Sequence, residues 1–239
     1  MKSSLVFFGG CTGIGKSRLL KSALDRFNSN EYVVVNISEH FNLCRKDDTG
    51  DENANIIWHR EHWKEYDKRV LNSLRTQISK NEKKLVIINQ HFATTSPSGY
   101  LPGIDLDTLD ALLEQHFNLS QVCTKIKKAN GSESTENGNK YSFGVLLIDT
   151  DPDVMLSNYN KQLGNGDKSI LGYVSNESIL KDLEENRKWA GIFSNRALSV
   201  LGGSRVFSDT IYVHDLAKQT QTIDEIATFF SCFGLAKQQ

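Results

Sequence analysis

The chain has 239 residues, of which 38% are hydrophobic and 24% charged, and a formal net charge of −1 at pH 7. This near-neutral balance disfavours a protein that mainly binds a nucleic-acid backbone, because such binding needs a surplus of positive charge. Recurrent apolar runs exclude general disorder, and a chain this long can bury roughly 70–75% of its extended surface without a stapling disulfide or metal. We expect a single domain over residues 1–239.

The four cysteines show neither metal-ligand spacing nor a disulfide framework; they are Cys11, Cys44, Cys123 and Cys232. Scattered thiols of this kind are typical of a reducing compartment. The first apolar run, Leu5–Phe8, is too short for an export signal, and no apolar stretch reaches the ~18 residues of a membrane span. The sequence therefore predicts a cytoplasmic protein that binds neither a membrane nor nucleic acid.

Short β-branched runs alternate with longer amphipathic segments along the chain. The strands predicted from the apolar runs are Leu5–Phe8, Tyr32–Ile37, Leu85–Asn89, Val145–Ile148 and Ile211–Val213. The helices predicted from the helical periodicity are Lys16–Phe27, Ile56–Ile78, Leu106–Gln115, Val154–Gln162 and Asn176–Leu201, with a last one from Thr222. Continuous apolar strands suit a parallel sheet covered on both faces, so the alternation predicts an α/β fold with three layers.

Two helix ends carry specific signals. Ser175 precedes the long helix as its expected N-cap, and Gly202 and Gly203 follow the helix as a stop. Thr222, with Glu225 three residues later, has the form of a capping box and predicts the start of the last helix.

Two segments break the alternation. Residues 125–142 are polar, rich in Asn, Gly, Ser and Glu, and lack periodicity, which predicts a flexible surface insertion. Residues 163–174 are rich in glycine and separate two predicted helices, so they form either a mobile lid or a plain loop.

The motif GxxxxGK[ST] follows the first strand and precedes a helix. Its residues are Gly10, Cys11, Thr12, Gly13, Ile14, Gly15, Lys16 and Ser17. Glycines let the backbone N–H groups point at phosphate oxygens, at the positive end of a helix. Lys16 would reach the β- and γ-phosphates, and the Ser17 hydroxyl would ligate Mg²⁺. The motif predicts a nucleotide-binding protein that uses ATP and Mg²⁺.

The remaining motifs narrow the class of nucleotide protein. The base-reading Asn/Thr-Lys-x-Asp motif of GTPases does not occur in the sequence. The run Val145–Asp149 has the apolar strand and terminal Asp of a Walker B element, which favours an ATPase and a metal-binding role for Asp149. Asp149 can equally cap the following helix with Asp151 and Pro152. The residues leave both interpretations open.

The segment Leu85–Gly103 carries a more specific signal. It contains Ser-Pro-Ser-Gly-Tyr-Leu-Pro-Gly at residues 96–103. It resembles the archaeal-type adenylate kinases, whose third strand ends in Asp-Thr-His before a Thr-Pro-x-Gly-Tyr-Leu-Pro-Gly loop. Residues 34–38, 146–156 and 175–204 also resemble successive elements of that family. The resemblance covers most of the chain except the insertion at 125–142.

The resemblance implies a P-loop kinase fold with a five-stranded parallel sheet, often assembled as a trimer, that transfers the ATP γ-phosphoryl group to AMP. It implies a pocket for AMP, or for another nucleoside monophosphate, formed by Asn36, Ser38, Lys64, His91, Ser98, Gly99 and Tyr100. It implies catalytic roles for Lys16, Lys168 and Arg187, and a magnesium site at Ser17 with Asn89 or Asp149. Judged by themselves, His91 and Tyr100 can equally have structural roles.

Several positions depart from the family pattern. The strand-ending Asp is Asn89, an arginine expected before the loop is Thr95, and the lid offers Lys161 and Lys168 in place of arginines. Lysine lacks the bidentate fork of arginine, so these are not equal replacements. The departures keep two alternatives open: a catalytically weakened paralogue that acts as a sensor or assembly ATPase, and a kinase of another small acceptor.

Overall fold

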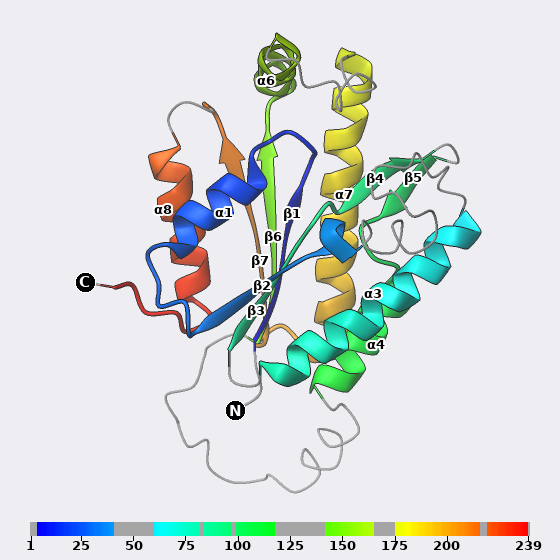
Figure 1. Cartoon of the computed structure of the whole chain (residues 1–239), viewed down its shortest axis with the longest axis vertical. Helices are drawn as coiled ribbons and strands as arrows, with labels where there is room; N and C mark the ends of the chain where they lie inside the picture. The colour runs from blue at the N-terminus through cyan, green and yellow to red at the C-terminus, as the bar shows by residue number, and fades with distance from the viewer. Residues whose placement is uncertain are drawn as a thin grey trace, which may run out of the picture.

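A central parallel sheet organises the molecule. The computed structural model describes residues 4–40, 60–81, 84–96, 99–117, 142–164, 175–215 and 219–238. Within them, five parallel strands lie in the order β2-β3-β1-β6-β7 (Figure 1). The strands are β1 (Leu5–Gly10), β2 (Tyr32–Asn36), β3 (Leu85–Gln90), β6 (Phe143–Thr150) and β7 (Val206–Val213).

The strand β1 lies in the middle of the sheet and every one of its residues is buried. Its Leu5 is opposite Val86 of β3 on one side and Phe143 of β6 on the other. Because side chains alternate across a strand, Phe7 and Phe8 point to opposite faces and enter two different hydrophobic clusters. Each face of the sheet therefore needs its own cover of helices.

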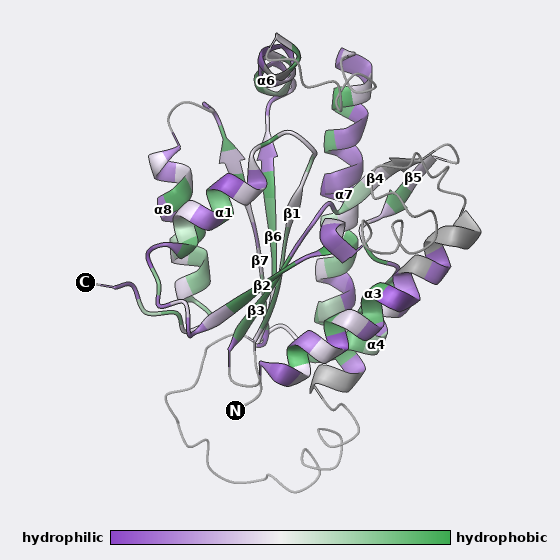
Figure 2. Cartoon of the chain, viewed as in Figure 1, coloured by the Kyte–Doolittle hydropathy of each residue, from purple (hydrophilic) through white to green (hydrophobic). Residues whose placement is uncertain are grey.

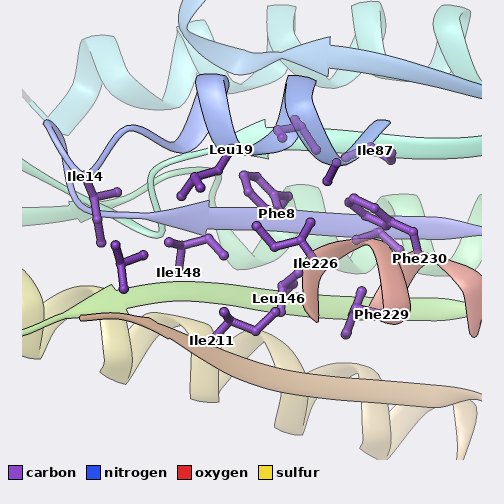
Figure 3. Close-up of a cluster of buried hydrophobic side chains, with 14 of the residues drawn as sticks. Phe8, Ile14, Leu19, Ile87, Leu146, Ile148, Ile211, Ile226, Phe229 and Phe230 are labelled. Carbon is purple, nitrogen blue, oxygen red and sulfur yellow. The ribbon is translucent and has the colours of Figure 1, made fainter. Parts of the chain in front are cut away.

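One face is covered by α1 (Lys16–Leu24) and α8 (Thr220–Ser231), and α6 (Pro152–Gly164) adds Tyr159 to the same cluster. Figure 3 shows Phe8 of β1 between Leu19 of α1 and Phe230 of α8. The opposite face is covered by α3 (Arg60–Lys80), α4 (Leu106–Phe117) and α7 (Asn176–Leu201). Figure 2 shows these helices striped with hydrophobic and hydrophilic residues, as expected of helices with one buried side. The predicted three-layer α/β fold is confirmed.

A small antiparallel hairpin stands apart from the main sheet. It consists of β4 (Ala93–Ser96) and β5 (Gly99–Pro102), with Ala93 opposite Pro102. The sequence analysis predicted only a loop here, because four-residue strands with threonine and proline lack a periodic signal. Close packing fixes the hairpin, since a Cβ on Gly103 would overlap the His91 carbonyl.

The two predicted helix starts have different outcomes. Ser175 caps α7 as expected, because its side chain accepts a hydrogen bond from the Ser178 amide. The capping box at Thr222 is wrong: α8 begins at Thr220 after Gln219, and Thr222 is 6% exposed inside the helix. Burial of the threonine side chain against the core explains why it does not serve as a cap.

Two expectations lie mostly outside the described residues. These are the insertion at 125–142, of which only Ser142 is described, and the lid segment at 163–174, of which only residues 163 and 164 are described. Within the described ranges, no helix combines the length and apolar character that crossing a membrane requires.

Candidate functional site

The P-loop joins the end of the central strand β1 to the start of α1 (Figure 1). Gly13 and Gly15 have φ angles of 80° and 81°, which side-chain-bearing residues rarely adopt. A Cβ on Gly13 would also overlap the Tyr159 ring. The glycine pattern of the motif is therefore required by the backbone path, and the loop opens at the carboxyl ends of the strands, where open α/β sheets bind ligands.

Two side chains of α6 hold the outer turn of this loop. Tyr159 donates a hydrogen bond of 2.7 Å from its hydroxyl to the Thr12 carbonyl, and Asn158 Nδ2 donates to the Gly13 carbonyl. Tyr159 is 1% exposed and packs in the cluster between the sheet and α1. With these carbonyls held from outside, the loop is a preformed cradle for an anion.

Lys16 is 8% exposed, and its ammonium group donates a 2.6 Å hydrogen bond to the Cys11 carbonyl. Its Nζ also lies 3.2 Å from His91 Nδ1. Burial lowers the pKa of Lys16 to about 8 because a charge is costly away from water. Burial raises the pKa of the Cys11 thiol to about 12, so this thiol stays protonated at neutral pH.

His91 lies beside the P-loop, directly after β3. Its Nδ1 is 3.0 Å from the Gly10 carbonyl as well as 3.2 Å from Lys16 Nζ. Burial, followed by the charge of Lys16, lowers its pKa to about 3, so the imidazole is neutral at physiological pH. In the neutral ring, Nδ1 either carries the proton and donates to the Gly10 carbonyl, or lacks it and accepts from Lys16. The uncharged imidazole can therefore pair with either group.

Asn89, the last residue but one of β3, connects the P-loop to β2. Its Nδ2 lies 3.4 Å from Ser17 Oγ and donates a 2.9 Å hydrogen bond to Asn36 Oδ1. Asn36 Nδ2 in turn donates to Glu39 Oε1 at 2.7 Å. Asn89 Oδ1 is buried and has no hydrogen-bond partner among the described residues. An unpaired buried oxygen, on the side chain whose nitrogen faces Ser17, fits a site where a hydrated cation binds.

Asp149 and Arg187 form a separate pair on the α7 side of the sheet. Arg187 Nε donates to Asp149 Oδ2 at 2.6 Å, and its terminal nitrogen donates to Oδ1 at 3.2 Å. The Thr150 amide donates to the same Oδ1. The carboxylate raises the pKa of Arg187, first through the hydrogen bond. Both residues also act electrostatically on the Cys11 thiol, which places the pair close to the P-loop.

The hairpin is tied to α7 through one buried side chain. Asn186, 2% exposed, accepts hydrogen bonds from the Phe92 and Ala93 amides at 3.0 and 3.2 Å. Its own amide donates to the carbonyls of Ala93 and Asp182. Asn186 thereby positions the chain that directly follows His91.

The structure brings together part of the predicted site. Lys16, Ser17, Asn36, Asn89 and His91 meet at the P-loop, and Ser38 lines the same pocket as Ser17. Gly99 and Tyr100 lie on the hairpin, where Lys181 of α7 stands 5.6 Å from the centre of the Tyr100 ring. Lys64 is exposed on α3. Ser98 and Lys168 lie outside the described residues.

The sequence analysis missed four residues of the site: Asn158, Tyr159, Asn186 and Glu39. The first three bind backbone groups on distant segments, and a helical pattern does not indicate which polar residue will meet such a group. Glu39 had a weak signal, since it directly follows the predicted acceptor residues Asn36 and Ser38.

The cradle fits a nucleoside triphosphate with Mg²⁺. The loop amides and Lys16 would hold the phosphates, and Ser17 with the orphan oxygen of Asn89 would face the ion. A P-loop after the central strand of a parallel sheet with this order, and with helices on both faces, defines the P-loop NTPase fold.

Comparison with known proteins adds little to this assignment. No protein-family model matches the sequence, and no curated protein does. Among solved structures, it is similar to a tunicamycin resistance protein of Deinococcus radiodurans, with 11% identity, 99% of this chain and 100% of that chain covered, and a TM-score of 0.47. It is also similar to a shikimate kinase of Bacteroides thetaiotaomicron, with 12% identity, 95% of this chain and 96% of that chain covered, and a TM-score of 0.44. A sugar kinase of Janibacter sp. has 12% identity, with 96% of this chain and 95% of that chain covered, and a TM-score of 0.47. With TM-scores this low, these likenesses carry no argument about activity.

Proposed function

We propose that the chain is an ATP-dependent phosphotransferase whose acceptor is a nucleoside monophosphate, with AMP as the first candidate. The observation that supports this is the convergence of Lys16, His91 and Asn89 at the P-loop, with His91 two residues before the hairpin that carries the Gly-Tyr-Leu-Pro sequence. The resemblance of that sequence to archaeal-type adenylate kinases supplies the acceptor.

We infer the P-loop side of the reaction from the contacts of Lys16 and His91. Lys16 would exchange the Cys11 carbonyl for the β- and γ-phosphate oxygens, and that exchange frees His91 Nδ1 to donate to the Gly10 carbonyl. Bound Mg²⁺ supplies positive charge that neutralises the phosphates. The bond from the γ-phosphorus to the bridging oxygen breaks, and ADP leaves as the acceptor oxygen binds that phosphorus.

A phosphate acceptor suits the chemistry of this pocket. An ionised phosphate oxygen needs no general base, whereas a hydroxyl acceptor must lose a proton. His91 is a poor base because its pKa is about 3. Next to it, Gln90 is 3% exposed, and both polar atoms of its side chain have no hydrogen-bond partner among the described residues. A polar ligand on the hairpin side would satisfy this amide.

A specific observation also favours a second candidate, a weakened nucleotide-binding paralogue. Arg187, which the resemblance predicts to be catalytic, is held by both oxygens of Asp149, and Asn89 carries no charge. Preorganised charge around the phosphoryl group supplies most of the catalysis in this reaction class. Loss of such charge would leave binding without efficient transfer.

The test is incubation of the purified protein with ATP, Mg²⁺ and a panel of nucleoside monophosphates, with diphosphate formation as the readout. We expect ADP from AMP, loss of the reaction in Lys16→Met, and wild-type behaviour in Lys21→Met, which removes an exposed charge from the same helix. ATP binding without any diphosphate product would favour the weakened paralogue. Phosphoryl transfer only to a non-nucleotide acceptor, assayed in parallel under the same conditions, would contradict the proposal.

The acceptor can be tested separately from the reaction. Tyr100 lies on β5 beside Lys181, and a base stacked on such a ring typically gains about 1–3 kcal/mol. Tyr100→Ala should weaken AMP binding at least about tenfold and leave ATP binding within about twofold, measured by calorimetry. Equal weakening of both nucleotides would place Tyr100 outside the acceptor pocket.

A further inference from the structure

A pocket of about 410 Å³ opens beside Ser17, between α1 and the edge strand β2. One end lies at the P-loop, where Ser17 is the second residue of α1 and Asn36 ends β2. Asp25 follows Ser17 by eight residues along the helix direction, a separation of about 12 Å at 1.5 Å per residue. Asp25 and Tyr32 therefore mark the far end of the pocket. The pKa of Tyr32 is raised mainly by burial and to a lesser extent by the charge of Asp25.

A chain of hydrogen bonds crosses the P-loop end of this pocket. Ser17 Oγ lies 3.4 Å from Asn89 Nδ2, Asn89 donates to Asn36 at 2.9 Å, and Asn36 donates to Glu39 at 2.7 Å. Glu39 is exposed and lines the pocket, as does Ser38. Two uncharged amides thus connect the serine of the P-loop to a carboxylate.

This carboxylate is well placed compared with the other candidates. Asn89 is 9% exposed and leaves its Oδ1 unpaired among the described residues, but an amide brings no charge. Asp149 carries a charge, yet both of its oxygens accept from Arg187, and the Thr150 amide shares one of them. Glu39 is the carboxylate in the hydrogen-bonded chain that begins at Ser17.

We propose, resting on the phosphotransferase function above, that Glu39 supplies the negative charge that positions the magnesium ion of a bound nucleotide beside Ser17. It supplies the negative charge that the neutral amide of Asn89 lacks. Magnesium keeps several of its waters in proteins, so a carboxylate that reaches the ion only through water can still orient it. Asn36 holds Glu39 in place, and Asn89 offers its free oxygen to the same waters. Glu39 is a positioning residue in this arrangement.

The test compares the affinity for ATP in excess Mg²⁺ with the affinity for ATP in excess EDTA, measured by calorimetry without an acceptor. The ratio of the two affinities reports how well the protein uses the ion. Glu39→Gln keeps an acceptor for Asn36 and removes only the charge, so folding is preserved. Outer-shell partners of a metal typically change its affinity 10–100-fold, and we expect the ratio to fall at least about tenfold.

Asp25→Asn is the matched control, because it removes one carboxylate from the far end of the same pocket. The Asp25 carboxylate is exposed and lies about a Debye length from Ser17, so the ratio of affinities should stay within about twofold of wild type. Adding Asn89→Asp to Glu39→Gln should restore much of the ratio by returning a carboxylate next to Ser17.

The outcomes separate this inference from the proposed function. An unchanged ratio in Glu39→Gln, or an equal loss in Asp25→Asn, would overturn the role of Glu39. Diphosphate formation by the same wild-type protein would leave the proposed phosphotransferase function standing. If the wild-type protein fails to bind ATP both in excess Mg²⁺ and in excess EDTA, the role of Glu39 and the proposed phosphotransferase function are both overturned.

Discussion

At the scale of single residues, Lys16 is buried although the role proposed for it requires a charge. Its pKa is lowered to about 8 by burial, so a large fraction of the lysine is neutral just above that pH. Nucleotide phosphates favour the charged form. Affinity for ATP should therefore be full well below pH 8 and decline as the pH rises through it.

This behaviour gives a first prediction. At pH 8, where about half of Lys16 is unprotonated, ATP binding should take up close to half a proton, and at pH 6.5 Lys16 should contribute none. Calorimetry in two buffers with different heats of ionisation measures the uptake. Lys16→Met should lack the uptake at pH 8 and Lys21→Met should retain it. Wild-type binding without proton uptake at pH 8 would show that Lys16 is already charged.

Asn186 shows how one side chain can hold a segment far away in the sequence. Two backbone amides depend on its oxygen, and a buried amide without a partner costs about 1–3 kcal/mol. Asn186→Leu should lower the free energy of unfolding by about 2–5 kcal/mol, measured by urea denaturation. Asn195→Leu, at an exposed position of α7, should change it by less than about 0.5 kcal/mol. Similar losses in both variants would mean that leucine itself disturbs the helix.

At the scale of elements, α3 and α4 are joined by a buried carboxylate. Asp67 of α3 is 3% exposed, accepts a 3.1 Å hydrogen bond from the Asp105 amide, and accepts another from the Thr108 hydroxyl. Burial raises its pKa to about 6, and the two hydrogen bonds oppose the rise. The folded state therefore disfavours the charged carboxylate more than the unfolded state does.

The sign of the pH dependence follows. A raised carboxyl pKa adds stability below the unfolded value, near pH 4, and that stability is lost as the pH rises through about 6. Asp67→Asn should flatten the loss of unfolding free energy between pH 4 and 7, by an amount on the order of 1–3 kcal/mol. Urea denaturation across this range measures it. Glu114→Gln, exposed on α4, should follow the wild-type curve. If the unfolding free energy of Asp67→Asn changed with pH in parallel with that of the wild type, the raised pKa of Asp67 would be contradicted.

Elements differ in how far the sequence predicted them. The P-loop, the parallel strands and the cap at Ser175 have local signals, because glycine spacing, apolar runs and a hydroxyl before a helix act over a few residues. The hairpin has no such local signal, and neither do the side chains that hydrogen-bond to distant backbone groups. Asn186 meets Phe92 from 94 positions away, and Tyr159 meets Thr12 from 147 positions away. Such contacts depend on tertiary packing, which also overrode the capping box at Thr222.

At the scale of the whole molecule, the P-loop extends from the central strand of the sheet. β1 is paired on both sides and covered on both faces, and the loop that follows it is held at Thr12 and Gly13 by α6. The same sheet thus supports the core and the nucleotide site, so a change that loosens β1 should affect stability and ATP affinity together.

The hydrogen bond from Tyr159 to Thr12 has a consequence for the entropy of binding. Fixing the backbone of one flexible residue costs about 1–2 kcal/mol of conformational entropy. The loop loses this freedom when the sheet and α6 pack together, before any nucleotide arrives. Nucleotide binding then restricts mainly the ligand and the Lys16 side chain. Tyr159, which binds a carbonyl of the loop, would thereby contribute to affinity by removing disorder in advance.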